Sequence, residues 1–103
     1  MDAAQEITLR DFMNTISEYG KYIRQLKKAT IDRMNCIMYI LRYTILHRNL
    51  WENDEEQKPF VHEFARHYKS YLYGNKIANF DYNNVQTIYM LCDQILDPEY
   101  VIG

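Results

Sequence analysis

The stretch from Thr30 to Leu50 constrains the fold of this chain more than any other part of its sequence. Drawn as a helix, it carries apolar side chains on nearly every face. Only a narrow polar strip remains: Asp32, Asn35, Arg42 and Asn49. A helix with so little polar surface must be covered by other elements on several sides. The pattern therefore predicts an all-α fold, a small antiparallel bundle of three or four helices with residues 31–50 as the central helix.

Composition supports a single helical domain. The chain has 103 residues, of which 48% are hydrophobic, so it can bury a core without a metal or a disulfide. Three glycines and two prolines are too few for a β-sandwich or barrel, which needs frequent turns. We expect a short disordered leader over residues 1–7 and one domain over residues 8–103.

Signals for helix ends divide the rest of the chain. Thr8 and Asp11 have the spacing of a capping box, which predicts a first helix from Thr8. We expect a loop over residues 50–58 with Trp51 turned back onto the core. Pro59 is expected at the first position of a helix that ends near Tyr73. A last helix is expected over residues 82–96.

Two points of the secondary structure stay open at this stage. No glycine or proline separates residues 8–26 from residues 31–50, so the sequence allows either a break near residues 28–31 or one helix over residues 8–50. Residues 37–46 are also rich in β-branched and aromatic side chains and have a competing interpretation as a buried strand.

The first helix carries a regular apolar stripe. Its members follow one another at gaps of three and four residues after Leu9: Phe12, Ile16, Tyr19, Ile23 and Leu26. This spacing is typical of a helix docked on its own bundle, and equally of a coiled-coil seam. We take these five residues as the candidate protein interface through which the chain forms a homo-oligomer, a dimer, or binds another protein. Gly20 lies off the stripe and could mark close approach of another chain.

Cellular location is inferred from what the sequence lacks. The N-terminus has neither the basic nor the apolar region of a secretory signal, and the longest apolar run is too short to span a bilayer. Cys36 and Cys92 lie in apolar runs, as buried thiols do. We therefore expect a soluble intracellular protein, in the cytoplasm or in the cytoplasm or nucleus of a host cell, with no membrane contact.

The sequence offers no catalytic constellation. His62 and His67 are five residues apart, so they point about 140° apart around a helix and cannot share one metal ion. Cys36 and Cys92 have no cysteine or histidine at metal-ligand spacing, and no phosphate-binding glycine loop is present. We expect no catalytic residues, no metal, no cofactor and no small-molecule substrate, and hence no enzyme.

A basic segment gives an alternative function. Four cations lie between Glu18 and Asp32 without an intervening acid: Lys21, Arg24, Lys27 and Lys28. They could contact the phosphates of a nucleic acid. The chain as a whole carries a net charge of −2, whereas nucleic-acid-binding domains are usually basic overall.

These observations favour a non-catalytic protein-interaction or regulatory module that self-associates. A small viral, phage or mobile-element protein that binds a host protein is consistent with the size and composition. Nucleic-acid binding through the basic segment is the first alternative, and a structural subunit of a larger assembly is the second.

Overall fold

A computed structural model describes residues 7–26, 30–74 and 82–97, and within these ranges the chain is helical or in turns, with no strand. The helices are α1 (Leu9–Gln25), α2 (Thr30–Leu46), α3 (Arg48–Trp51), α4 (Lys58–Gly74) and α5 (Tyr82–Leu96). Four long helices and the one-turn α3 pack together, which confirms the prediction of a small all-α bundle. The strand interpretation of residues 37–46 is wrong, because all of them lie in α2.

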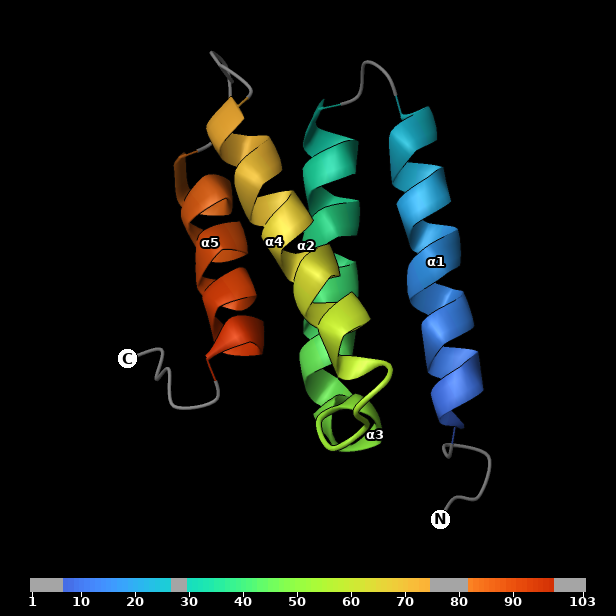
Figure 1. Cartoon of the computed structure of the whole chain (residues 1–103). Coiled ribbons are helices and arrows are strands. Elements are labelled where there is room, and N and C mark those ends of the chain that lie inside the picture. Colours follow the sequence, from blue (N-terminus) through green and yellow to red (C-terminus); the bar gives the residue numbers. More distant parts are fainter. Residues whose placement is uncertain (1–6, 27–29, 75–81, 98–103) are drawn as a thin grey trace.

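The arrangement places α2 at the centre of the bundle. α2 lies between α1 and α5, and α4 crosses in front of it (Figure 1). α2 contacts α5 most extensively, and it also contacts α1 and α4. α1 and α4 run in the same direction, and α2 and α5 run in the opposite one (Figure 1). The apolar faces of Thr30–Leu46 are thus covered from several sides, as its narrow polar strip predicted.

The start of α1 is fixed by a capping box. The backbone N–H of Asp11 donates to Oγ1 of Thr8 at 3.0 Å, and the backbone N–H of Thr8 donates to the Asp11 carboxylate at 3.4 Å. This confirms the predicted helix start. Ile7 packs against the core, so the packed part of the chain begins one residue before Thr8. The rest of the expected leader lies outside the described residues.

The chain breaks between α1 and α2, so one helix over residues 8–50 is excluded. α1 ends at Gln25 with Leu26 as its C-cap, and α2 begins at Thr30; residues 27–29 are outside the described part. Nε of Arg33, in the first turn of α2, donates to the carbonyl oxygen of Ile23 at 3.2 Å. The same carbonyl accepts the backbone N–H of Leu26 at 3.1 Å, so the Arg33 bond is a second one that ties the start of α2 to the end of α1.

The central helix is shorter than the sequence predicted. Residues 31–50 were expected to be continuous, but α2 ends at Leu46, His47 leaves helical geometry with φ −104° and ψ 27°, and α3 follows. The reason is the indole of Trp51, whose Nε1 donates to the carbonyl oxygen of Thr44 at 2.9 Å. The change of direction at His47 lets Trp51 enter the core, where it is fully buried, as predicted.

The loop before α4 is closed by Asp54. Its Oδ1 accepts the backbone N–H groups of Glu56 at 3.0 Å and Gln57 at 2.8 Å, in the manner of a helix N-cap. α4 is assigned from Lys58, so Pro59 stands second and not first as expected. Its missing N–H is tolerated there because it still lies within the first turn.

One hydrophobic core joins all five helices. Each of the five helices contributes to its largest fully buried side chains: Trp51, Phe12, Met34, Ile37, Ile40, Leu41, Ile88, Ile95 and Val61. Arg48 ties α3 to α5, because its guanidinium donates to the carbonyl oxygen of Gln94 and to Glu52 at 3.2 Å. The same guanidinium lies 5.1 Å from the centre of the Trp51 ring.

Candidate interaction surfaces

A row of tyrosines crosses from α1 to α2 on one side of the bundle. The Tyr19 and Tyr39 rings are 5.3 Å apart, and the Tyr39 and Tyr43 rings are 6.4 Å apart. Tyr22 and Cys36 lie beside Tyr19, and with Glu18 they line a hollow of about 550 Å³. We call Tyr19, Tyr22, Cys36, Tyr39 and Tyr43 the α1–α2 aromatic face.

The environment of this face raises the pKa of two of its side chains, Tyr19 and Cys36. Partial burial, the nearby phenol of Tyr39 and a hydrogen bond with it raise the pKa of Tyr19. Burial, and then the charge of Asp32, raise the pKa of Cys36. A thiol with a raised pKa forms little thiolate at neutral pH, and the thiolate is the nucleophilic form. The face is therefore suited to contact and poorly suited to nucleophilic chemistry.

An exposed strip runs along α2 at the edge of this face. Asp32, Asn35 and Arg42 are exposed, as the sequence predicted, and Tyr39 and Leu46 are exposed with them, at 53% and 74%. These five residues are separated by gaps of three, four, three and four, so they lie within about 80° of one another around α2. We call them the α2 strip.

A groove lies between α1 and α4. It has a volume of about 370 Å³. Its lining includes Ser17, Gly20 and Arg24 from α1 and Phe60, Phe64 and His67 from α4. Tyr22 and Arg24 are two residues apart, which places them about 160° apart around α1. The α1–α4 groove and the α1–α2 aromatic face are thus on opposite sides of α1.

The predicted interface on the first helix is mostly inside the protein. Phe12, Ile16 and Ile23 are 0%, 5% and 4% exposed, and they belong to the core of the single chain. Tyr19 and Leu26 are partly buried. Three of the five residues therefore have almost no surface to offer a partner, and Tyr19 alone joins the aromatic face.

The structure does not bring the four predicted phosphate contacts together into one site. Nζ of Lys21 lies 3.8 Å from the carboxylate of Glu18, on the exposed side of α1. Arg24 lines the α1–α4 groove. Lys27 and Lys28 lie outside the described residues.

The histidines and the second cysteine have packing contacts. His62 lies edge-on to Trp51, with ring centres 5.9 Å apart, and His67 lies edge-on to Tyr68 at 5.2 Å. Cys92 is fully buried in the core, where burial raises its pKa to about 12. In the described part of the chain, no three histidine, cysteine or acidic side chains are grouped to hold a metal ion.

Three large apolar side chains are exposed although helical spacing alone would place them on apolar faces. They are Tyr39 and Leu46 of α2 and Phe60 of α4, which is 66% exposed. The sequence contained a sign that Tyr39 and Leu46 are exposed. Each lies between two members of the polar series Asn35, Arg42 and Asn49, which repeats every seven residues. No comparable signal marked Phe60.

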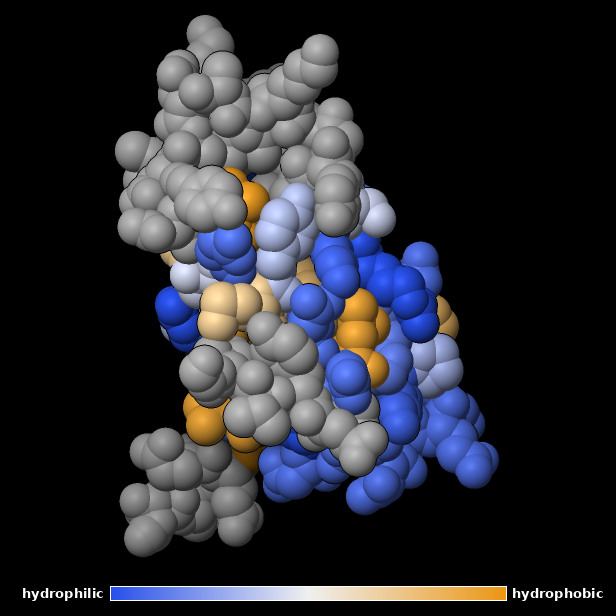
Figure 2. All heavy atoms as spheres, turned by 90° about the vertical axis from the view of Figure 1, so that its left-hand side faces the viewer, coloured by the Kyte–Doolittle hydropathy of each residue, from blue (hydrophilic) through white to orange (hydrophobic). Residues whose placement is uncertain are grey.

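The described surface over α5 is largely hydrophilic, with apolar residues visible as small separate patches (Figure 2). None of the helices in the described ranges combines the length and apolarity needed to cross a membrane.

Comparison of the chain with models of known protein families, with curated proteins and with solved structures finds no match in any of the three. The geometry of the α1–α2 aromatic face, the α2 strip and the α1–α4 groove is therefore the basis for assigning a function.

Proposed function

We propose that this chain is a non-catalytic protein-interaction module that associates with a second copy of itself through the α2 strip and the α1–α2 aromatic face. The observation that carries the proposal is the exposure of Tyr39 and Leu46 on a helix whose other apolar side chains, where they are described, are buried or partly buried. Single exposed apolar residues are ordinary on a protein surface. Tyr39 differs because its ring continues into the contacts with Tyr19 and Tyr43.

The charges of the α2 strip favour a second copy as the partner. Asp32 and Arg42 stand ten residues apart, about 15 Å along the helix, and neither belongs to an ion pair among the described residues. Two α2 helices packed antiparallel about their midpoint bring Asp32 of each copy opposite Arg42 of the other. The same register places Asn35 opposite Tyr39. A twofold interface repeats each contact, so both charge pairs form together.

Light scattering on a sizing column, at low and at moderate salt, tests this proposal. We expect a dimer. Replacing Tyr39 by Ala should weaken it, so that the variant dissociates at a higher protein concentration than the native chain, whereas Phe60→Ala on α4, away from the proposed interface, leaves the mass unchanged. A monomer at every accessible protein concentration overturns self-association.

Charge reversal tests the register. Asp32→Arg alone and Arg42→Asp alone should each weaken the dimer by about tenfold, because each creates two repulsive pairs. An equimolar mixture of the two variants should restore a dimer, since a mixed pair has opposite charges at both contacts. Equal dimer affinity in the native protein, in each of the two variants and in their mixture contradicts the antiparallel register.

A further inference from the structure

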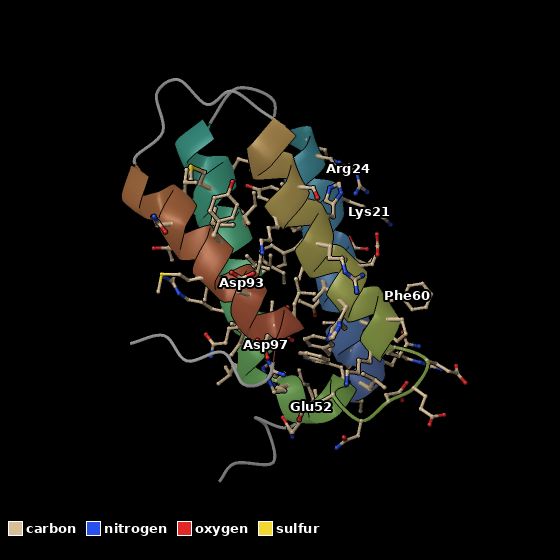
Figure 3. All side chains as sticks on the ribbon, turned by 60° about the vertical axis from the view of Figure 1, so that its left-hand side comes forward. Lys21, Arg24, Glu52, Phe60, Asp93 and Asp97 are labelled. Carbon is tan, nitrogen blue, oxygen red and sulfur yellow. The ribbon has the colours of Figure 1, made fainter. Side chains whose placement is uncertain are left out.

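The α1–α4 groove is the second surface with chemistry of its own, and it lies on the side of α1 away from the proposed dimer face. Arg24 stands toward one end of the groove and Phe60 toward the other (Figure 3). His67 is seven residues after Phe60 on α4, which is about 10 Å along the helix. The groove thus has the guanidinium of Arg24 at one end and the aromatic rings of Phe60 and Phe64 toward the other.

Gly20 lines the groove at a position where the fold would also accept a small side chain. A Cβ built on Gly20 would meet one heavy atom of the described residues outside its own helical backbone, Nη1 of Arg24 at 3.7 Å, which is ordinary contact. Alanine would therefore fit, and it would favour the helix, since glycine is a poor helix former. Gly20 is itself buried, and the Arg24 guanidinium lies beside the position of the missing side chain, so another backbone can approach Gly20 only when Arg24 turns aside to a partner carboxylate.

Charge identifies what the groove can accept. Arg24 is exposed and forms no ion pair among the described residues. The acidic side chain of the groove, Glu63, is engaged by Arg66 of its own helix at 3.0 Å. A carboxylate entering beside Arg24 therefore meets an available guanidinium, and guanidinium–carboxylate pairs are among the strong hydrogen bonds in proteins.

We propose that the α1–α4 groove binds an amphipathic helix of a partner protein that carries an apolar side chain and, two turns later, a carboxylate. The apolar side chain packs between Phe60 and Phe64, the carboxylate pairs with Arg24, and the backbone of the partner helix passes over Gly20. Two helical turns span about 11 Å, similar to the rise of about 10 Å along α4 from Phe60 to His67. Recognition by anchors one or two turns apart is the usual mode for a helix in a groove.

An alanine-based helical peptide with a leucine and, seven residues later, a glutamate is the probe. Titrated into the ¹⁵N-labelled full chain, it should shift the amide resonances of residues 16–24 and 60–67. A matched peptide with glutamine in place of glutamate should bind about tenfold more weakly, because the charge-assisted bond is lost. Shifts that are absent, or equal for the two peptides, overturn the proposal.

Variants of the protein separate the groove from the fold and from the dimer. Arg24→Gln should weaken binding of the glutamate peptide about tenfold, whereas Lys21→Gln, outside the groove, should not. Gly20→Ala should raise the melting temperature by about 4–8 °C and still weaken binding of the glutamate peptide. If Gly20→Ala leaves peptide affinity unchanged, the close approach at Gly20 is refuted.

The groove proposal and the dimer proposal can be refuted independently of each other. The titration is repeated with Tyr39→Ala, whose dimer is weakened. Unchanged peptide binding is expected there, because Tyr39 lies on the other side of α1. Loss of binding in Tyr39→Ala would instead place the peptide on the dimer face and overturn the groove assignment while leaving the interaction module intact.

Discussion

Nε1 of Trp51 donates a hydrogen bond of 2.9 Å to the carbonyl oxygen of Thr44, and both residues are fully buried. Thr44 lies near the end of α2 and Trp51 ends α3, so this bond fixes the two helices on either side of His47. The Thr44 hydroxyl in turn donates to the carbonyl oxygen of Ile40 at 2.7 Å. The end of the central helix therefore depends on one indole N–H.

Trp51→Phe should lower the free energy of unfolding by at least about 1–3 kcal/mol, because the buried Thr44 carbonyl loses its donor. The smaller ring adds to this loss by leaving space in the core. Urea unfolding followed by circular dichroism measures the change, since Trp51 is the single tryptophan and its fluorescence is lost. Phe60→Leu at the surface is the control, and a loss below about 0.5 kcal/mol for Trp51→Phe would contradict the role of the bond.

Asp54→Ala should destabilise the protein by about 1 kcal/mol, because the N–H groups of Glu56 and Gln57 lose the carboxylate that accepts them. Asp54→Asn keeps a capping oxygen and serves as the matched control. Thermal unfolding of the two variants should separate them by several degrees. Equal melting temperatures would show that the cap contributes nothing.

The double variant Ile16→Glu and Ile23→Glu should unfold the chain and not merely make it monomeric. Both side chains lie in the core, and a buried, unpaired carboxylate costs more than a small domain can lose. Circular dichroism at neutral pH reads out the loss of helix. Tyr22→Glu, at an exposed position of the same helix, should stay folded; a folded double variant would mean that α1 packs differently.

Stability should fall as the pH drops below about 6.5. Burial, and then the charges of Lys58, Arg66 and Arg48, lower the pKa of His62 below its usual value. The unfolded chain therefore takes up a proton at a pH where folded His62 is still neutral, and the proton favours unfolding. This loss begins near the unfolded pKa and ends below the folded one.

Urea midpoints between pH 7.5 and 5 measure this effect. His62→Gln cannot take up the proton and should flatten the dependence in this range. A dependence of the same slope in His62→Gln would assign the effect to other groups.

The two cysteines should differ in reactivity. Cys36 is partly exposed in the hollow of the aromatic face, whereas Cys92 is fully buried and its pKa is raised to about 12. Alkylation of the native protein with iodoacetamide, followed by mass spectrometry, should label Cys36 slowly and leave Cys92 unmodified. Both should react in denaturant; early labelling of Cys92 would show that the core opens locally.

Much of the fold could be predicted from local signals. The capping box of Thr8 and Asp11 and the last helix over residues 82–96 follow from patterns within a few residues. The break before Thr30 stayed open, because no glycine or proline marks it. The end of α2 at Leu46 could not be predicted in this way. It depends on a bond between Thr44 and Trp51 that exists only when the chain has turned at His47.

The surfaces were harder to predict than the helices, because apolar spacing shows which residues share a face and not what covers that face. The stripe through Phe12, Ile16 and Ile23 has the regular spacing of an association seam, yet the chain's own core covers it. Tyr39 and Leu46 are equally apolar, and they are exposed because no other described helix lies over that side of α2.

The packing of α2 against α5 has a consequence for synthesis on the ribosome. The two helices are separated by about fifty residues, so α2 emerges from the exit tunnel well before its main partner exists. At a translation rate of about 5–20 residues per second, α5 is completed about 3–10 s after α2, and until then the apolar side chains of α2 lack this partner. In that interval the nascent chain is a substrate for chaperones, and a message truncated before codon 82 yields a product that cannot close its core.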